Sequence, residues 1–318
     1  MHKVLLNAVT GGKTREFCGN LRKTLLVLST ALIVSASLAA AAKSSRAVKS
    51  ILPSAAPSGA PRRKVIALTF DDGPKPYVLF GTSLPDGTKS QSLLNLLEAE
   101  RVKATFFVMG WRLAKSADRF CVEKDGGHTC RSAAEEEHRL GFEIENHTYG
   151  HGNFRLMEKR YGDAWILNDI DRCSRIVQSI TGVWPRDVRP PDWTIWPALQ
   201  QKIKARGYHV MSKSRSLPAV LRDVDSEDYF CAGPNPIHCP KPSLYDYVLE
   251  RVRERERRGI YEHILCFHEL PITVQVLSRL IPVLKARGYA FVTLSTYFRA
   301  VGFPADASSA APPKQAAD

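Results

Sequence analysis

Residues 204–208 read KARGY, and residues 285–289 repeat the same five letters. In both copies a glycine follows a helix-forming segment and an apolar stretch begins at once, as where a helix ends at its C′ glycine and a strand starts. Such joints are typical of parallel β/α architectures. Roughly six or seven units of this kind fit in the chain, which favours an α/β fold with a distorted, incomplete TIM-like (β/α) barrel. A doubly wound open sheet is the alternative.

Earlier segments extend the same alternation of strands and helices. Residues 64–70 (KVIALTF), 104–109 (ATFFVM) and 142–144 are apolar runs that predict strands. Residues 156–180 predict one helix, because apolar side chains recur on one face of it: Trp165, Ile166, Ile170, Cys173, Ile176 and Val177.

The two ends of the chain differ in composition from the middle. Basic residues precede an apolar run over 25–38 and four alanines at 39–42, which predicts a signal peptide over 1–42. An uncleaved single membrane anchor is the alternative, and only then would the protein contact a membrane. Residues 43–61 read as an Ala/Ser/Pro-rich linker and 301–318 as a disordered tail, which leaves one domain over 62–300. We therefore expect a secreted or periplasmic protein.

The cysteines agree with export to an oxidising compartment. Two pairs are close in sequence, Cys121 with Cys130 and Cys231 with Cys239, and each occupies a Gly-, Pro- or charge-rich loop. Loops of this kind favour local disulfides in secreted proteins. Cys266 stands in an apolar strand-like run, so we expect it to be a buried free thiol.

The chain is strongly basic, with a formal net charge of +13. Such a surface favours anionic surroundings, or it keeps the protein soluble. No helix-turn-helix, RNP or zinc-finger pattern accompanies the charge, so nucleic acid is not an expected partner.

Chemistry-bearing residues follow two of the predicted strands directly. Residues 69–74 read TFDDGP, where Asp71 and Asp72 are adjacent carboxylates before a Gly-Pro turn. Residues 146–151 read NHTYGH, where His147 and His151 have the i, i+4 spacing that lets two imidazoles bind one cation. Two histidines and one carboxylate suit Zn²⁺, Co²⁺, Fe²⁺ or Ni²⁺ and leave positions for water and substrate.

TFDDGP followed by HTYGH closely resembles the polysaccharide deacetylase (NodB-homology) family, over roughly residues 62–300. The resemblance implies a distorted β/α barrel that hydrolyses N- or O-acetyl groups of glycans. It implies that Asp71 is the catalytic base, and that Asp72, His147 and His151 hold one divalent metal ion. Zinc is the first candidate for that metal.

Three later motifs complete the resemblance. Arg189 begins RPPDW, and the family likeness assigns it as the cation beside Asp71. Asp192 stands where the family has an aromatic residue, so we expect its backbone N–H to help bind the oxyanion, and Trp193 to contact substrate.

The motif DSEDY over 225–229 resembles the family's Asp-x-x-Asp-Trp. It implies that Asp225 orients the catalytic histidine and that Tyr229 forms a wall for sugar stacking. The run ILCFH over 264–268 places His268 at a strand end, where it would protonate the leaving amine.

The expected function is therefore metal-dependent deacetylation of an acetylated polysaccharide or oligosaccharide. One alternative is an amidohydrolase of the same fold that acts on a small amide or a lipid-linked sugar. The other is a non-catalytic glycan-binding protein, but a binding protein has no use for both a base and an acid.

Overall fold

The computed structural model describes residues 63–84, 87–114, 127–232 and 238–303. These residues all fall in one unit, Gly59–Asp318. The predicted signal peptide and linker and Cys121 lie outside the described residues, as does the predicted tail beyond residue 303. Val301 and Phe303, predicted to belong to that tail, instead pack against the cluster that contains residues of α11 (Leu294–Ala300). None of the helices in the described part of the chain combines the length and apolar composition of a membrane span.

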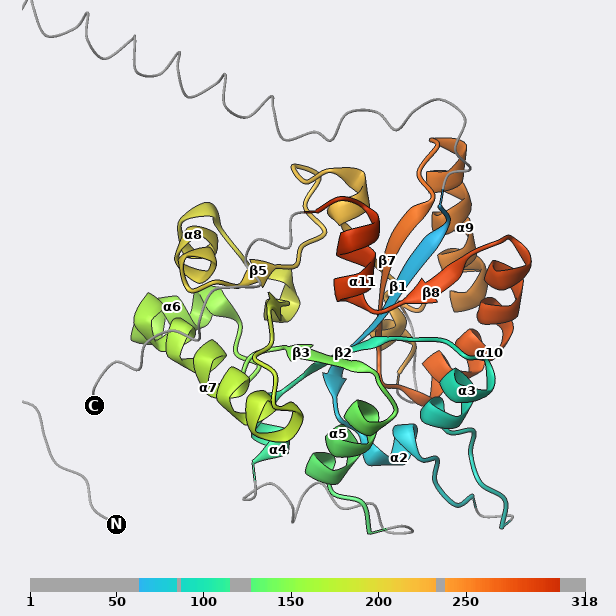
Figure 1. The fold of residues 1–318 in the computed structure, drawn as a ribbon, viewed down its shortest axis with the longest axis horizontal. Coiled ribbons are helices and arrows are strands. Elements are labelled where there is room, and N and C mark those ends of the chain that lie inside the picture. Colours follow the sequence, from blue (N-terminus) through green and yellow to red (C-terminus); the bar gives the residue numbers. More distant parts are fainter. Residues whose placement is uncertain (1–62, 85–86, 115–126, 233–237, 304–318) are drawn as a thin grey trace, which may run out of the picture. The chain divides into compact units, whose positions relative to one another are not determined.

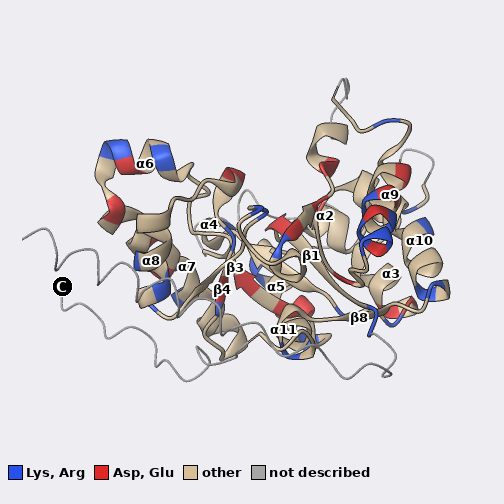
Figure 2. Ribbon diagram, turned by 90° about the horizontal axis from the view of Figure 1, so that it is seen from above, with Lys and Arg blue, Asp and Glu red and all other residues tan. Residues whose placement is uncertain are grey.

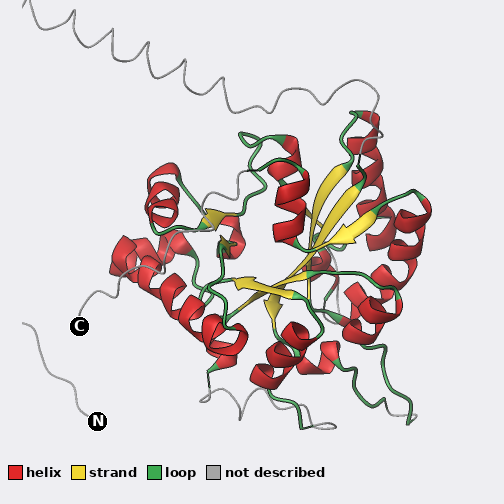
Figure 3. Ribbon diagram, in the orientation of Figure 1, coloured by secondary structure: helices red, strands yellow, loops and turns green. Residues whose placement is uncertain are grey.

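A single sheet of eight strands, all paired in parallel, forms the centre of the fold (Figures 1 and 3). The main path runs in the order β5-β4-β3-β2-β1-β7-β6, and β8 pairs with β1. Within the described residues β5 and β6 do not pair with each other, so the barrel stays open between them, as predicted. The strands are β1 (Val65–Gly73), β2 (Thr105–Val108), β3 (Glu143–Asn146), β4 (Asp187–Val188), β5 (His209–Val210), β6 (Asp223–Asp225), β7 (Glu262–His268) and β8 (Ala290–Val292).

Helices surround this sheet (Figure 3). The two KARGY segments form the predicted joints: Gly207 and Gly288 adopt φ angles of 85° and 86°, and each lies between a helix and a strand. The helices are α2 (Pro76–Leu79), α3 (Leu93–Ala99), α4 (Gly110–Leu113), α5 (Cys130–Arg139), α6 (Phe154–Tyr161), α7 (Asp163–Thr181), α8 (Pro197–Ala205), α9 (Leu244–Arg257), α10 (Pro271–Ala286) and α11 (Leu294–Ala300), with 3₁₀ turns η3 (Pro191–Trp193), η4 (Ala219–Leu221) and η5 (Asp228–Cys231).

The single helix predicted over 156–180 is wrong in one respect, because the segment forms two helices. α6 ends and α7 begins at Gly162, whose φ of 77° and ψ of 171° fit no helix. Glycine adopts such angles without a Cβ clash. The apolar periodicity continued across the break and so concealed it.

Both faces of the sheet are buried, which explains the continuous apolar run of β1. Ile66, Leu68 and Phe70 pack into the cluster formed with the outer helices. Val65 and Ala67, which point the other way along the strand, pack with residues of α11 instead. The fold therefore fills the barrel interior with side chains and leaves the strand ends free for chemistry.

The predicted cysteine pairing is confirmed where the structure tests it. Cys231 and Cys239 form a disulfide. Cys130 is also disulfide-bonded, but Cys121 lies outside the described residues, so that pairing stays a prediction. Cys173 and Cys266 are free and buried, as expected for Cys266.

Candidate active site

The predicted motifs meet at one edge of the sheet. Strand pairing places Asp71 of β1 beside His268 of β7. It also places Asn146, the last residue of β3, beside Val188 of β4, so His147 and Arg189 both leave the sheet at the same edge. Because the strands are parallel, their carboxyl ends form one face of the barrel, which is where barrel enzymes carry their catalytic groups.

The last residue of β1, Gly73, must be glycine for a steric reason. A Cβ on Gly73 would lie 1.6 Å from Oε1 of Glu269, the residue that follows β7. Glu269 is fully buried, and its Oε2 accepts a 2.6 Å hydrogen bond from the backbone N–H of Lys75. The loops after β1 and β7 are therefore packed directly against each other, which fixes Asp71 and Asp72 relative to His268.

Asp72, His147 and His151 form the group with metal-binding geometry in the described residues. Their ligand atoms lie within 4.8 Å of one another. Oδ1 of Asp72 is 3.4 Å from Nε2 of His147 and 3.1 Å from Nε2 of His151. The structure thus brings together the three residues proposed as ligands.

The nitrogen and oxygen atoms of this group are arranged to bind a cation and not to form hydrogen bonds with one another. Nδ1 of His147 is 2.8 Å from the carbonyl oxygen of Arg189, so that nitrogen is placed to donate a proton, and the tautomer that does so presents a lone pair at Nε2. The lone pair faces Oδ1 of Asp72, which is buried and accepts no properly aligned hydrogen bond. Facing lone pairs repel unless a positive charge lies between them, and a backbone carbonyl that orients a histidine is a common feature of metal sites.

The loops of the site carry most of the strained backbone. Seven non-glycine residues in the described ranges have positive φ, and six of them belong to the predicted motifs or to the turns within them. Strain of this kind persists where the surrounding structure fixes a functional geometry. The six are Asp72, Thr148, His151, Asp192, Trp193 and Glu227.

Arg189 contacts Asp71, as expected, and a second carboxylate that sequence reasoning missed. Its fully buried guanidinium donates hydrogen bonds of 2.5 Å to Oδ1 of Asp71 and 2.5 Å to Oδ1 of Asp223. Burial alone would raise the pKa of Asp71, but the charges of Arg189 and of the nearby histidines outweigh it and lower that pKa. Asp71 is therefore held ionised. Asp223 precedes Asp225 by two positions on β6, so strand alternation could have identified it.

Cys266 is a further neighbour of Asp71. Its buried thiol lies 3.4 Å from Oδ2 of Asp71, on the carboxylate oxygen that Arg189 leaves free. Burial raises the pKa of this thiol well above its ordinary value, so it stays protonated and can donate to the carboxylate.

The prediction that Asp225 orients His268 is wrong, because Asp228 does so. Nδ1 of His268 lies 2.7 Å from Oδ1 of Asp228, and the backbone N–H of His268 donates to Oδ2 of the same carboxylate at 2.8 Å. Burial lowers the pKa of His268, but the Asp228 carboxylate and the more distant Asp71 and Asp72 more than offset this and raise it to about 9. Asp225 instead accepts hydrogen bonds from Nε1 of Trp193 at 3.0 Å and from Nζ of Lys213 at 2.9 Å.

The residues expected to contact substrate lie around this centre. Tyr229 is 40% exposed, and its ring lies edge-on to the His268 ring with 5.2 Å between centroids. The side chain of Asp192 is turned towards Asn153, whose Nδ2 donates to Oδ2 of Asp192 at 3.0 Å. That orientation holds the negative charge of Asp192 in a hydrogen bond to the loop before α6.

Comparison with known proteins gives consistent matches. Residues 58–211 match the family model described as polysaccharide deacetylase. A peptidoglycan-N-acetylglucosamine deacetylase of Bacillus cereus is 28% identical over 245 residues, which cover 76% of this chain and 71% of that protein. A chitin deacetylase of Colletotrichum lindemuthianum is 24% identical over 72% of this chain and 77% of its own length.

Solved structures match at the level of the fold. A family 4 acetyl xylan esterase from Clostridium thermocellum, in complex with a cobalt ion, superposes with a TM-score of 0.55 at 24% identity, over 78% of this chain and 97% of that one. The peptidoglycan deacetylase PdaC from Bacillus subtilis gives 0.53 at 24% identity, over 76% and 93%. The predicted incomplete TIM-like barrel is confirmed by this likeness and by the sheet order.

Proposed function

We propose that this chain, which is similar to polysaccharide deacetylases, is a hydrolase that removes N-acetyl groups from a glycan of N-acetylated sugars, with one divalent metal ion in its site. The observation that carries the proposal is that a carboxylate held ionised and an imidazole held protonated lie on neighbouring strands. An Arg-bound carboxylate, Asp71, and a carboxylate-bound imidazole, His268, face each other from neighbouring strands beside the Asp72, His147 and His151 group.

The three ligand residues define what the metal would contribute. A divalent ion held by Asp72, His147 and His151 would polarise the acetyl carbonyl and acidify water. Zinc is our first candidate, because two imidazoles, one carboxylate and open positions are a usual catalytic zinc set.

Asp71 is the proposed base. Its Oδ1 is occupied by Arg189, so Oδ2, which also lies 3.4 Å from the Cys266 thiol, is the oxygen that would take a proton from the attacking water. Arg189 keeps this carboxylate ionised, and Asp223 and Thr69 in turn hold Arg189 in place. Because Asp71 is not proposed as a metal ligand, it can accept a proton without breaking any bond to the metal.

His268 is the proposed acid. Asp228 occupies its Nδ1, so Nε2 is the nitrogen that can donate a proton to the departing amine. An amine is a poor leaving group without protonation, and a raised pKa keeps the imidazole charged at neutral pH. The base and the acid thus have separate charged partners, which hold them in opposite protonation states.

The relatives suggest the substrate class. Two of the similar proteins are named for N-acetylglucosamine in peptidoglycan and for chitin, and both names specify removal of an acetyl group from N-acetylated sugars. The export signal predicted over 1–42 would bring this enzyme to cell-wall glycans outside the cytoplasm.

Acetate release tests the proposal. The wild-type protein loaded with zinc should release acetate from chitotetraose or from soluble peptidoglycan fragments. His151→Ala should lose both stoichiometric metal binding and acetate release, whereas His138→Ala, which removes an exposed histidine of α5, should lose neither. Undiminished metal content in His151→Ala would refute the ligand assignment, and acetate release from acetylxylan alone would assign the activity to esters.

A further inference from the structure

The turn that carries the two proposed histidine ligands is short and has strained backbone. Only three residues separate His147 from His151. Thr148 and His151 adopt φ angles of 67° and 54°, values that non-glycine residues seldom take without support from their surroundings. Both imidazoles nevertheless approach Oδ1 of Asp72, so the surrounding structure must hold this turn in shape.

Helix α7 supplies one side of that support, because it packs beside β3 and α4 (Figures 1 and 2). Oδ2 of Asp169 accepts hydrogen bonds from the backbone N–H of Tyr149 at 3.1 Å and from that of Gly150 at 3.2 Å. Asp169 is only 8% exposed, so both hydrogen bonds are largely shielded from water. A carboxylate that binds two successive N–H groups fixes the orientation of both peptide units.

The start of α4 holds the same turn from the other side. The backbone N–H of Gly110 donates to the carbonyl oxygen of Thr148 at 3.0 Å, and that of Trp111 donates to the next carbonyl oxygen at 3.0 Å. Gly110 leaves room for this approach, since a Cβ there would lie 2.9 Å from the Tyr149 ring. Because these contacts come from backbone, a side-chain substitution cannot remove them, whereas it can remove those of Asp169.

Asn146, at the end of β3, ties the beginning of the turn to the same helix. Its Oδ1 accepts from the backbone N–H of Thr148 at 2.7 Å. Its Nδ2 donates to the carbonyl oxygen of Ile170 at 2.8 Å and to Oγ of Ser174 at 2.7 Å, both on α7. α7 is therefore the element against which the turn is set, and Asp169 is its contact with the middle of the turn. Asp169 lies outside the sequence motifs that predicted the site.

We propose that Asp169 is a positioning residue for the metal site: it holds the peptide units between His147 and His151 and so sets how their two Nε2 atoms converge. This inference rests on the ligand assignment in the proposed function. Asp169 touches neither the metal nor the substrate, and it acts through the backbone of the turn. Groups that orient metal ligands from behind are typically worth about 10–100-fold in metal affinity.

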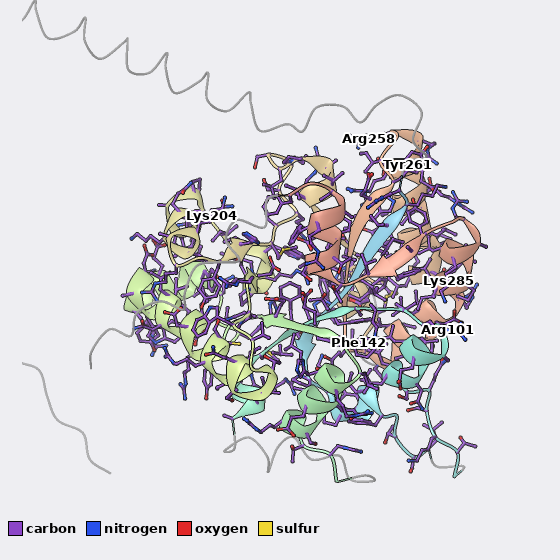
Figure 4. All side chains as sticks on the ribbon, viewed as in Figure 1. Arg101, Phe142, Lys204, Arg258, Tyr261 and Lys285 are labelled. Atoms are coloured by element: carbon purple, nitrogen blue, oxygen red, sulfur yellow. A yellow bond between two sulfur atoms is a disulfide. The ribbon has the colours of Figure 1, made fainter. Side chains whose placement is uncertain are left out.

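Asp171 is the matched control, because it is a second buried aspartate of α7 whose hydrogen bonds go to a different part of the fold. Its Oδ1 accepts from the hydroxyl of Tyr208 at 2.9 Å, and its Oδ2 binds Arg206. Both partners follow α8, on which Figure 4 labels Lys204. Residues two apart do not share a helix face, so Asp171→Ala removes a buried carboxylate from another side of α7 than Asp169→Ala does.

The Kd for zinc is measured on the full chain by competition with a chromophoric chelator. It should rise about 10–100-fold in Asp169→Ala. It should rise about three- to tenfold in Asp169→Asn, whose amide oxygen can still accept both N–H groups, because neutral hydrogen bonds are roughly half as strong as charge-assisted ones. Asp171→Ala should keep the wild-type Kd, even where its free energy of unfolding falls as far as that of Asp169→Ala. With cobalt in place of zinc, the visible absorption spectrum should change in Asp169→Ala and stay that of the wild type in Asp171→Ala.

A wild-type Kd for zinc in the Asp169 variants would overturn the proposal. An equal rise in Asp171→Ala would also overturn it, because metal binding would then follow the stability of α7 alone. Where Asp169→Ala does not fold, Asp169→Asn decides by the same comparison. His151→Ala separates this inference from the ligand assignment: undiminished zinc binding in that variant would refute the assignment itself, whereas its loss there, with a wild-type Kd in the Asp169 variants, would refute the role of Asp169 alone.

Discussion

Arg189 joins two carboxylates in the barrel interior, and this makes it the most constrained residue of the site. Its guanidinium is fully buried between Asp71 and Asp223 and lies over the ring of Phe107, 4.0 Å from the centroid. Removing one partner of a buried ionic group leaves an uncompensated buried charge, which lowers the free energy of unfolding far more than the loss of a surface ion pair does.

Arg189→Met should therefore destabilise the protein strongly. We expect the free energy of unfolding to fall by about 3–5 kcal/mol, because both carboxylates lose their buried partner. Arg139→Met removes one member of the exposed pair with Glu136 and should leave the free energy of unfolding nearly unchanged. Urea unfolding of both variants measures this, and equal stabilities would contradict the buried arrangement.

Asp228 controls His268, and the pH dependence of activity should reveal it. His268 must be protonated to donate, and its pKa of about 9 keeps it so until the pH rises through that value. In Asp228→Asn the imidazolium loses its carboxylate partner, so its pKa should fall towards 6.5 or below, and the alkaline loss of kcat should begin at lower pH.

Asp225→Asn is the control for that experiment, because Asp225 contacts Trp193 and Lys213 and not His268. Its alkaline limb should stay close to that of the wild type. A larger shift in Asp225→Asn than in Asp228→Asn would restore the assignment that the sequence motif suggested.

At the scale of elements, short breaks in regular structure position the site. Gly162 separates α6 from α7, and both Gly162 and Gly182, at the end of α7, have positive φ with open space where a Cβ would lie. They differ in ψ, which is 171° at Gly162 and −4° at Gly182. Only the second lies in the left-handed helical region that asparagine tolerates.

Substitution by asparagine at both positions should separate the two conformations. Gly162→Asn should lower the free energy of unfolding by about 1–3 kcal/mol, because its backbone region is almost exclusive to glycine. Gly182→Asn should lower it by less than about 1 kcal/mol. Thermal or urea unfolding measures both, and a Gly162→Asn variant as stable as Gly182→Asn would contradict the sharp helix boundary.

At the scale of the whole molecule, the sequence predicted the fold class and the residues that follow the carboxyl ends of the strands. Parallel strands bring their carboxyl ends together, so the proposed metal ligands, Asp71 and His268 could be placed on one face from the sequence alone. What it could not predict depends on short irregular elements. β6 has three residues, and Glu227 after it has a φ of 59°. Spacing alone does not show that this turn directs Asp228, and not Asp225, to His268.

The central claim is that Asp71 acts as the general base and His268 as the general acid. It is tested most directly by comparing hydrolysis of an amide with hydrolysis of an activated ester. Acetate release is measured for Asp71→Asn and His268→Ala on an N-acetyl glucosamine oligomer and on an aryl acetate. Asp71→Asn should lose both activities by about 10²–10⁴-fold, because both reactions need an activated water.

His268→Ala should lose the amide activity by a similar factor and keep most of the ester activity, since an aryl alcohol departs without a proton. Equal loss of amide and ester hydrolysis in His268→Ala would show that His268 does not protonate the leaving group, and would contradict the account.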